Sequence, residues 1–409
     1  MGIWHKKTLK PLLDTMQSGT RPKGGVSVDS GKIPSLGGEN ILQKGGITLD
    51  KLNMVSEEFF KGMNKGILEE KDVLINKDGA NTGKVGWFIN SGLTKASINE
   101  HLFLLRGKKD LLDNGYLYYF LLSQFGQIQI KNRISGSAQP GLNSRFVGDF
   151  LIELSEDTKE QTQIATILST LDRVIASTEQ LISKYQRIKT GLLHDLLTRG
   201  IDEHGNLRSE KTHKFKDSKL GRIPGEWDPS TIGKSCFVRN ELRFPLSQDV
   251  RAKMQGDYRY YGPTGIFDYI NEYRVDGKYV LIGEDGDHFL KYKTQEQTIL
   301  VIGKFNVNNH AHILEGSKDC LTEWIHLFFS LRDITLHLTR QGAGRYKLNK
   351  TSLLNLDIAL PKVDEQREIL KIVDALKKKN EQDKLNLSKL QSLKTGLMQD
   401  LLSGKVKVK

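Results

Sequence analysis

The chain contains a long internal repeat that covers two stretches of helical character. Residues 160–200 align without a gap with residues 365–405, and corresponding positions differ by 205 in number, since 160 becomes 365. The identities cluster at both ends of the aligned stretches: Glu160/Glu365, Gln161/Gln366, Ile164/Ile369, Lys189-Thr-Gly-Leu192/Lys394-Thr-Gly-Leu397 and Asp195-Leu-Leu197/Asp400-Leu-Leu402. An internal repeat constrains the architecture before any other feature. The period is about half the chain, which indicates duplication and fusion of one ancestral unit.

Apolar residues in both stretches recur in steps of three and four, the pattern of helices that pack as coiled coils. We expect the first helix to be capped by Thr158 at its start and by Gly200 at its end. In the second copy the middle, residues 377–384, is charged, so we expect that stretch to be solvated or splayed. The residues that we expect on the packing or docking face of the two helices are Ile164, Leu171, Leu181, Tyr185, Leu192, Ile369, Leu376, Leu390 and Leu397.

The regions outside the helices read as two mixed, strand-rich globular units that echo one another. The sequence Asp72–Gly79 resembles Tyr279–Gly286, and Gly136–Asn143 resembles Gly342–Asn349 less closely. The globular regions have diverged far more than the helices. The predicted organisation is a first globular domain at 1–157, a long helix at 158–200, a linker or extended strap at 201–222, a second globular domain at 223–361, and a second long helix with a tail at 362–409.

The composition excludes several classes of protein. No apolar run approaches the roughly 18 residues that a bilayer span requires, and the first residues lack a secretory signal. Only Cys236 and Cys320 are present, which argues against a disulfide framework and favours a reducing, cytoplasmic setting. The formal net charge of +12 favours polyanionic partners, nucleic acid before anionic membrane. A basic protein without such a partner is the alternative.

No catalytic constellation is recognisable in the sequence. Gly79–Val85 resembles a phosphate-binding loop, but it is one residue short between its glycines and lacks the Ser/Thr that would hold Mg²⁺. His310 and His312 have the spacing of two ligands on one strand face, yet no carboxylate or Cys cluster completes a metal site. We therefore expect no metal and no cofactor bound by this chain.

Basic and aromatic residues interleave in both globular units, in the combination that contacts phosphates and base edges. The alternative for each residue is a solvated basic face with core tyrosines. The candidate DNA-binding residues are Lys77, Asn81, Lys84, Arg133, Gln139, Asn143, Arg145, Tyr258, Tyr260, Tyr261, Lys304, Asn308, Arg340, Arg345, Tyr346 and Lys347.

Taken together, these residues resemble the specificity subunit of type I restriction–modification systems. The most specific features are the Lys-Thr-Gly-Leu…Asp-Leu-Leu helix ends at 189–197 and 394–402. The strap between 198 and 227 and the loop Gly136-Ser-Ala-Gln-Pro-Gly-Leu-Asn143 add to the resemblance. The second copy departs from the family's loop, because Gly342–Asn349 lacks the Gln-Pro pair.

The resemblance implies an α+β fold with two target-recognition domains and two long helices packed as an antiparallel coiled coil in a pseudo-twofold repeat. Each domain would read one half of a bipartite site in double-stranded DNA, and the helices would set the spacer. Two modification subunits, carrying S-adenosylmethionine, would dock on the helices, and restriction subunits would bring ATP and Mg²⁺. The chain itself would be non-catalytic. Two alternatives remain: a DNA-modifying enzyme that acts alone, and a coiled-coil scaffold that binds no DNA.

Overall fold

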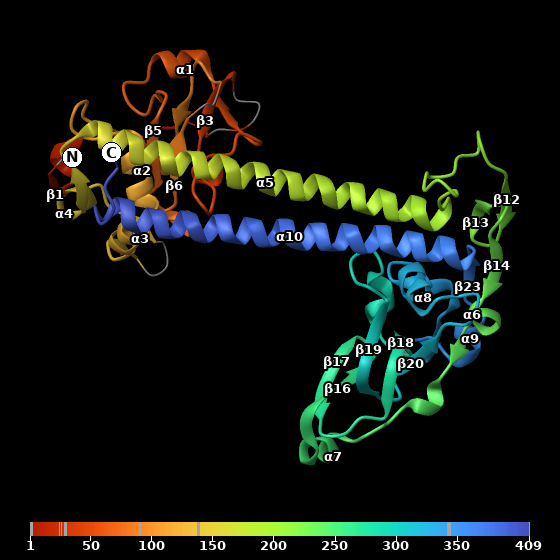
Figure 1. Cartoon of the computed structure of the whole chain (residues 1–409). Coiled ribbons are helices and arrows are strands. Elements are labelled where there is room, and N and C mark those ends of the chain that lie inside the picture. Colours follow the sequence, from red (N-terminus) through yellow and green to blue (C-terminus); the bar gives the residue numbers. More distant parts are fainter. Residues whose placement is uncertain are drawn as a thin grey trace. The chain divides into compact units, whose positions relative to one another are not determined.

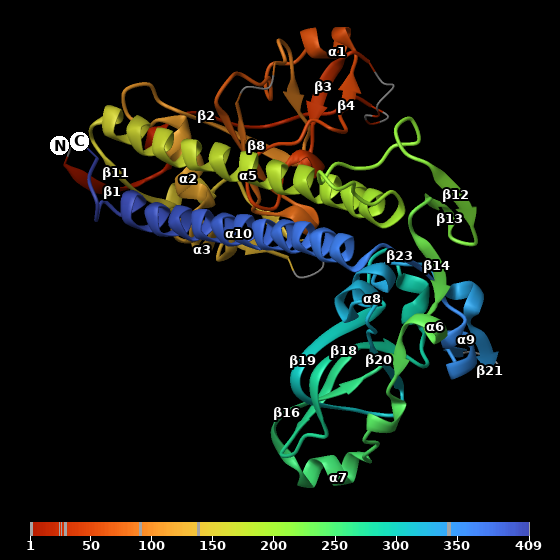
Figure 2. The same cartoon turned by 45° about the vertical axis from the view of Figure 1, so that its right-hand side comes forward.

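A computed structural model describes residues 3–23, 25, 27, 31–89, 92–136, 140–341 and 345–408. The chain divides into two compact units, and each long helix contributes residues to both of them. Unit 1 comprises Met1–Leu181 and Asp383–Lys409, and unit 2 comprises Ile182–Gln382. Figures 1 and 2 show the elements of each unit in two views.

Unit 1 is built on an antiparallel sheet in the order β2-β8-β5-β6, beside the smaller pairings β4-β3-β7, β1-β11 and β10-β9. Its strands are β1 (Trp4–Thr8), β2 (Leu13–Ser18), β3 (Ile33–Leu36), β4 (Asn53–Val55), β5 (Asp72–Asn76), β6 (Val85–Phe88), β7 (Ser97–Ile98), β8 (Leu102–Gly107), β9 (Ile134–Ser135), β10 (Gly141–Leu142) and β11 (Leu151–Ser155). Its short helices are α1 (Glu57–Lys61), α2 (Asn114–Leu122), α3 (Gln124–Lys131) and α4 (Phe146–Asp149), with 3-10 turns η1 (Lys10–Leu12), η2 (Gly38–Asn40) and η3 (Gly79–Asn81).

Unit 2 has a larger sheet in the order β15-β20-β18-β19-β16-β17, with the pairs β14-β23, β12-β13 and β21-β22 beside it. Its strands are β12 (Phe215–Ser218), β13 (Gly221–Pro224), β14 (Asp228–Thr231), β15 (Phe237–Val238), β16 (Gln255–Gly262), β17 (Gly265–Ile270), β18 (Val275–Gly283), β19 (Thr298–Val307), β20 (Ala311–Glu315), β21 (Thr339–Gln341), β22 (Arg345–Lys347) and β23 (Asp357–Leu360). Its short helices are α6 (Ile232–Ser235), α7 (Gln248–Lys253), α8 (Thr322–Phe329) and α9 (Lys350–Leu354), with η4 (Asn240–Leu242), η5 (Asp287–Lys291) and η6 (Thr335–His337).

The two units share a topology that follows from the repeat. In unit 1, β5 pairs antiparallel with β8, and α2 follows β8; in unit 2, β18 pairs antiparallel with β20, and α8 follows β20. The central strands are apolar and buried, as are most residues of α2 and α8. Each sheet therefore packs one face against a helix, which is how a mixed α/β layer buries its core.

The long helices are α5 (Thr158–Thr198) and α10 (Val363–Leu402), which confirms both predicted helices. The N-cap prediction was wrong by one residue, because Thr158 lies inside α5 and the Asp157 carboxylate accepts the Lys159 N–H at 3.0 Å. Gly200 adopts φ +61° after the last turn and its N–H donates to the Asp195 carbonyl, as expected of a C-terminal cap.

Contacts between the helices occur within each unit. In unit 1, Lys394 Nζ lies 2.5 Å from Asp172 Oδ1, and Gln391 donates to Glu179. Asp172 precedes Glu179 on α5, whereas the partner of Asp172, Lys394, follows Gln391 on α10. The two segments therefore run in opposite directions within this unit. In unit 2, Leu196 of α5 shares a buried cluster with Ile369 of α10.

The helix ends are better buried than their middle. Ile164 and Ile369 are fully buried, whereas Leu181 and Tyr185 are 43% and 40% exposed. Leu181 and Tyr185, two of the residues predicted for the packing or docking face, are therefore left partly uncovered by the chain itself. Residues 377–384 lie within the continuous helix α10, and most of them are exposed although Asp383 is buried, which confirms the expected solvation for most of this charged stretch.

Residues 201–222 are folded and are not a simple linker. They contain β12 and the start of β13, which form a hairpin. Arg208 is almost fully buried, and its guanidinium pairs with Glu365 of α10. This segment is thus part of unit 2. None of the helices in the described part of the chain combines the length and apolarity of a bilayer span.

Candidate nucleic-acid interface

A hairpin docks against the end of a central strand in unit 1. The hairpin consists of β9 and β10. It attaches to the segment after β5 through two main-chain hydrogen bonds: Leu142 N–H donates to Lys77 O at 2.6 Å, and Gly79 N–H donates to Pro140 O at 3.0 Å. These bonds join the end of the Asp72–Gly79 segment to Pro140 and Leu142, which belong to the predicted loop.

Unit 2 contains the same arrangement. The hairpin of β21 and β22 lies against the segment after β18. Leu348 N–H donates to Glu284 O at 2.8 Å, and Gly286 N–H donates to Tyr346 O at 3.0 Å. Both sequence echoes, the strand end and the hairpin, therefore meet at one place in each unit.

An Asp–His pair lies beside each hairpin. In unit 1, His101 Nδ1 is 2.6 Å from Asp78 Oδ1; in unit 2, His310 Nδ1 is 2.8 Å from Asp285 Oδ2. The histidine side chains are 48% and 49% exposed. Burial therefore does not explain why both units hold this pair.

Next to the first hairpin is an open, polar cavity of about 860 Å³. Lys77 and Asn143 both line it, so it joins two of the predicted residues. The Lys77 ammonium donates to Ser18 Oγ at 3.0 Å and lies 5.4 Å from the centre of the Phe103 ring. The other polar residues that line this cavity are Gln17, Ser18, Lys65, Asp78, Ser135 and Ser144.

The other candidate residues in unit 1 differ in whether their side chains already make contacts within the protein. Arg145 is exposed and makes no side-chain hydrogen bond or ion pair with any described residue, so its guanidinium is available to a ligand. Asn81 and Lys84 line a neighbouring cavity of about 420 Å³. Arg133 has a structural role instead, because it donates to two main-chain carbonyls, Gln129 O at 2.8 Å and Asp149 O at 2.7 Å. Gln139 lies outside the described residues.

Three candidates in unit 2 belong to its interior, and for these the prediction of surface contacts was wrong. Tyr260 is fully buried, and its hydroxyl donates to Phe244 O at 2.6 Å. Tyr261 packs edge-on against Phe305 in the core. Asn308 is 8% exposed and its side-chain oxygen caps the N–H of His310.

The remaining candidates of unit 2 lie at two places on its surface. Around β16, Tyr258 and the exposed Lys304 both contact Tyr273, and the bond to the Tyr273 hydroxyl raises the pKa of Lys304. On the β21–β22 hairpin, Arg340 donates to the Tyr346 hydroxyl and lies 4.8 Å from the centre of its ring. The hairpin also carries exposed Arg345 and the half-buried Lys347, which pairs with Glu284 at 3.4 Å.

His310, just before β20, and His312, within β20, take part in separate contacts. His312 is buried and its Nε2 lies 2.7 Å from Leu348 O, while burial lowers its pKa. Within the described ranges, no group of three or more His, Cys, Asp and Glu side chains has a metal-binding arrangement. His310 takes part in the Asp–His pair instead.

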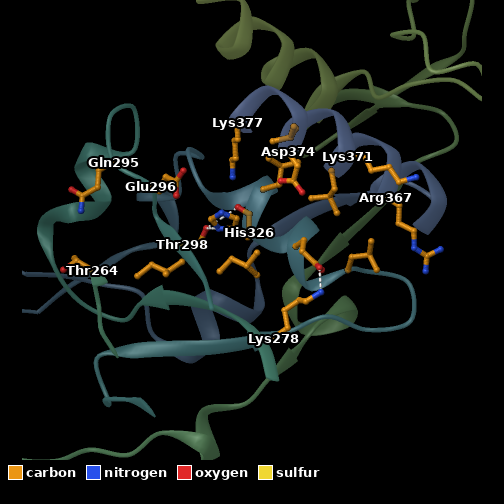
Figure 3. Close-up of a pocket in the computed structure, with 17 residues that line it drawn as sticks. Thr264, Lys278, Gln295, Glu296, Thr298, His326, Arg367, Lys371, Asp374 and Lys377 are labelled. Carbon is orange, nitrogen blue, oxygen red and sulfur yellow. Dashed lines mark hydrogen bonds and ion pairs between the residues drawn. The ribbon is translucent and has the colours of Figure 1, made fainter. Parts of the chain in front are cut away.

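A separate cavity of about 890 Å³ lies in unit 2 between α8, the β18–β19 strands and the first half of α10 (Figure 3). Its lining mixes cations and carboxylates: Lys278 pairs with Glu323, and Lys371 and Lys377 extend from α10. His326 lies at its wall with Nδ1 2.9 Å from Thr298 Oγ1. None of the residues that line this cavity is among the predicted site residues.

A comparison with protein families decides which family the chain belongs to. The model of the type I restriction modification DNA specificity domain matches residues 1–187 and 224–390. The chain is a member of the type I restriction–modification specificity family. Specificity chains of this family are non-catalytic components of their complexes, and this chain is one of them.

A relative from the specificity family covers most of the chain, and two solved structures show the same fold. The type I restriction enzyme MjaVIII specificity subunit of Methanocaldococcus jannaschii is 25% identical over 386 residues, which cover 87% of this chain and 84% of that protein. The crystal structure of a type I S subunit from M. genitalium has the same fold, with a TM-score of 0.57 at 17% identity, covering 98% of this chain and 96% of that one. The HsdS subunit from Thermoanaerobacter tengcongensis gives a TM-score of 0.52 at 13% identity, covering 98% and 97%.

The Asp–His pairs were missed by sequence reasoning about this specificity chain. The matching segments Asp72–Gly79 and Tyr279–Gly286, which contain Asp78 and Asp285, were recognised, but the histidines lie more than twenty residues after these aspartates. The available signal was the triplet Asn-x-His, which occurs as Asn99-Glu-His101 and as Asn308-Asn-His310.

Proposed function

We propose that this chain is the DNA-recognition subunit of a type I restriction–modification complex, in which each globular region reads one half of a bipartite duplex site. The observation that carries this proposal is the repeated hairpin site with diverged side chains. Unit 1 presents Lys77 and Arg145 there, whereas unit 2 presents Glu284 and Arg345. Similar frames with different side chains suit two different base sequences. In this proposal the recognition domains are residues 1–157 and 223–361.

The long helices act as an antiparallel coiled-coil spacer between the two recognition domains. A helix of 41 residues, the length of α5, is about 60 Å long at about 1.5 Å per residue. That is enough to hold two readers on one face of a duplex about one helical turn, or 34–36 Å, apart. The charged stretch 377–384 and the exposed middle of α5 leave the helix surfaces accessible.

Two modification subunits dock on these helices, one on each copy of the repeat. Exposed apolar residues on α5 support this role: Val174, Leu181, Tyr185 and Ile188 are each 40% or more exposed. A duplicated surface binds two copies of one partner in pseudo-twofold fashion. The modification subunits supply S-adenosylmethionine, restriction subunits supply ATP and Mg²⁺, and the complex acts in the cytoplasm.

The decisive experiment expresses the chain with its modification subunit in a host without adenine methylation and maps methylated adenines across the genome. The expected result is one bipartite motif, absent when this chain is omitted. Methyl transfer by the purified chain alone would favour the stand-alone enzyme. A complex that modifies DNA without any bipartite preference would favour the scaffold.

A further inference from the structure

The Asp–His pairs share more than the contact between their side chains. In both units the histidine follows two residues after an asparagine whose side-chain oxygen accepts the histidine N–H: Asn99 at 3.0 Å in unit 1 and Asn308 at 2.9 Å in unit 2. The histidine carbonyl in turn accepts an N–H from the residue just before the aspartate, Lys77 at 2.9 Å and Glu284 at 2.8 Å.

The residues around the pairs have diverged. Lys77 corresponds to Glu284, so a cation stands where the other unit has a carboxylate. Asn81 corresponds to His288, and the Gln-Pro pair of the first hairpin is missing from the second. The Asp–His geometry has therefore been kept where its neighbours were free to change.

Under the proposed function, the residues that are alike in the two units have a different role from those that differ. A side chain that is the same in both units cannot distinguish two different half-sites. It can serve whatever both half-sites share, and the sugar-phosphate backbone is common to any duplex. The half exposure of both histidines leaves the rings accessible to such a ligand.

The chemistry of the pair fits a phosphate oxygen. With both ring nitrogens protonated, Nδ1–H donates to the aspartate and fixes the ring, and Nε2–H is left to donate to an anion. In unit 1, Nε2 also lies 3.4 Å from Glu100 Oε1. Glu100 has a second cationic partner, Arg21 at 3.0 Å, so a phosphate can take over Nε2 without leaving this carboxylate unpaired.

We propose that His101 and His310, each held by its aspartate, are sequence-independent phosphate contacts that anchor the two recognition domains on the DNA backbone. This inference rests on the proposed function. It separates anchoring residues, which are alike in the two units, from reading residues, which differ.

The test uses the full chain in complex with its modification subunits, with every variant measured in the same buffer. The variants are His101→Gln, His310→Gln and the double variant, with His204→Gln as the control because that side chain is 75% exposed and belongs to the Asp202–Gly205 turn, which is part of neither hairpin. Affinity is measured for the bipartite duplex and for a scrambled duplex over a range of salt concentrations.

Each single variant should weaken both duplexes by the same factor and reduce the slope of log affinity against log salt by about 0.9, and the double variant by about 1.8. The variants His101→Lys and His310→Lys should restore the slope of log affinity against log salt. A purely structural role of the histidines would not predict this result. The proposal is overturned if a folded variant keeps the slope, if only the bipartite duplex is weakened, or if the modification subunit dissociates while the slope is unchanged. A wild-type complex without preference for the bipartite duplex would instead refute the proposed function.

Discussion

Gln161 and Gln366 occupy matching positions in α5 and α10 and make matching hydrogen bonds. Each side chain is fully buried. Gln161 Oε1 accepts the Asp113 N–H, and its Nε2 donates to Leu111 O and Ser155 O. Gln366 repeats this with the Leu321 N–H, Asp319 O and Pro361 O. Gln161 thus links α5 to the residues just before α2, and Gln366 links α10 to the residues just before α8.

Replacing Gln161 by Leu should destabilise unit 1 by about 3 kcal/mol, because it leaves buried main-chain groups without partners. Hydrogen exchange read by mass spectrometry should rise in 111–122 and stay unchanged in 319–329. Gln163→Leu, on the exposed side of the same helix, is the control. Equal loss of protection in both segments would contradict the local role of Gln161.

Glu365→Ala should destabilise unit 2 by about 3–5 kcal/mol, because it leaves the buried Arg208 guanidinium without its main partner. The Glu365 carboxylate accepts from Arg208, from the Ile201 N–H at 3.0 Å and from the Trp227 indole at 3.2 Å. Denaturant unfolding is the measurement, with the exposed Glu368→Ala as control. The double variant Arg208→Met/Glu365→Leu should be more stable than Glu365→Ala, and a less stable double variant would show that packing, not the buried charge, dominates.

Unit 2 should lose stability as the solution is acidified below about pH 6.5, the ordinary histidine value. Burial lowers the pKa of His312 and His326 in the folded chain. The unfolded chain then binds more protons, so stability is complete above the unfolded pKa and falls as pH decreases toward the folded pKa. Unfolding midpoints of wild type and His326→Gln between about pH 7.5 and 5.5 test this. The unfolding midpoint of His326→Gln should depend less steeply on pH than that of the wild type, whereas His204→Gln should show the wild-type dependence. If the midpoints of all three proteins change with pH in parallel, the buried histidines do not cause the loss of stability.

Arg145→Ala should relax the first half-site alone, at a cost of about 1–3 kcal/mol for a lost base contact. Arg345→Ala should do the same for the second half-site. The readout is the methylated motif and the affinity for duplexes changed in one half-site. Arg133→Ala should lower stability instead, since its guanidinium holds main-chain carbonyls. If Arg145→Ala relaxed both half-sites equally, its side chain would not be a reader.

Inserting seven residues into both long helices, after Leu181 and after Gln382, should lengthen the spacer and leave the half-sites unchanged. Seven helical residues add about 10.5 Å, which corresponds to about three base pairs at about 3.4 Å each. Mapping the methylated motif measures the spacer. The same insertion in the turn at Glu203–Gly205 should leave the spacer as it was. Altered half-sites would refute the spacer role.

The helices were predictable because their repeat and periodicity are local properties of the sequence. The burial of individual residues along the helices was not predictable, because periodicity identifies an apolar face but not the residues that cover it. Ile164 is covered by the core of unit 1, whereas Tyr185 is 40% exposed with the same spacing. The exposed apolar residues of α5 are those on which other parts of the chain pack least.

Individual contact residues were harder to predict than the loops that carry them. Tyr260 and Tyr261 stand in a basic, aromatic stretch typical of a surface, but both are buried. Tyr261 packs in the core, and Tyr260 packs against the segment that contains Phe244 and Arg251. Arg133 follows a helix whose last carbonyls need donors, and it satisfies one of them. Neither outcome is visible in residue type or spacing, since each depends on which elements pack nearby.

Unit 1 is assembled from both ends of the chain, and this has a consequence for biosynthesis. Its core includes Leu401 and Leu402 from the end of α10, and a Cβ on Gly404 would lie 2.6 Å from the Trp4 ring. The first 181 residues therefore leave the ribosome long before the residues that complete their core. A chain that stops early would therefore leave an open apolar surface on unit 1, which the full chain covers with Leu401 and Leu402.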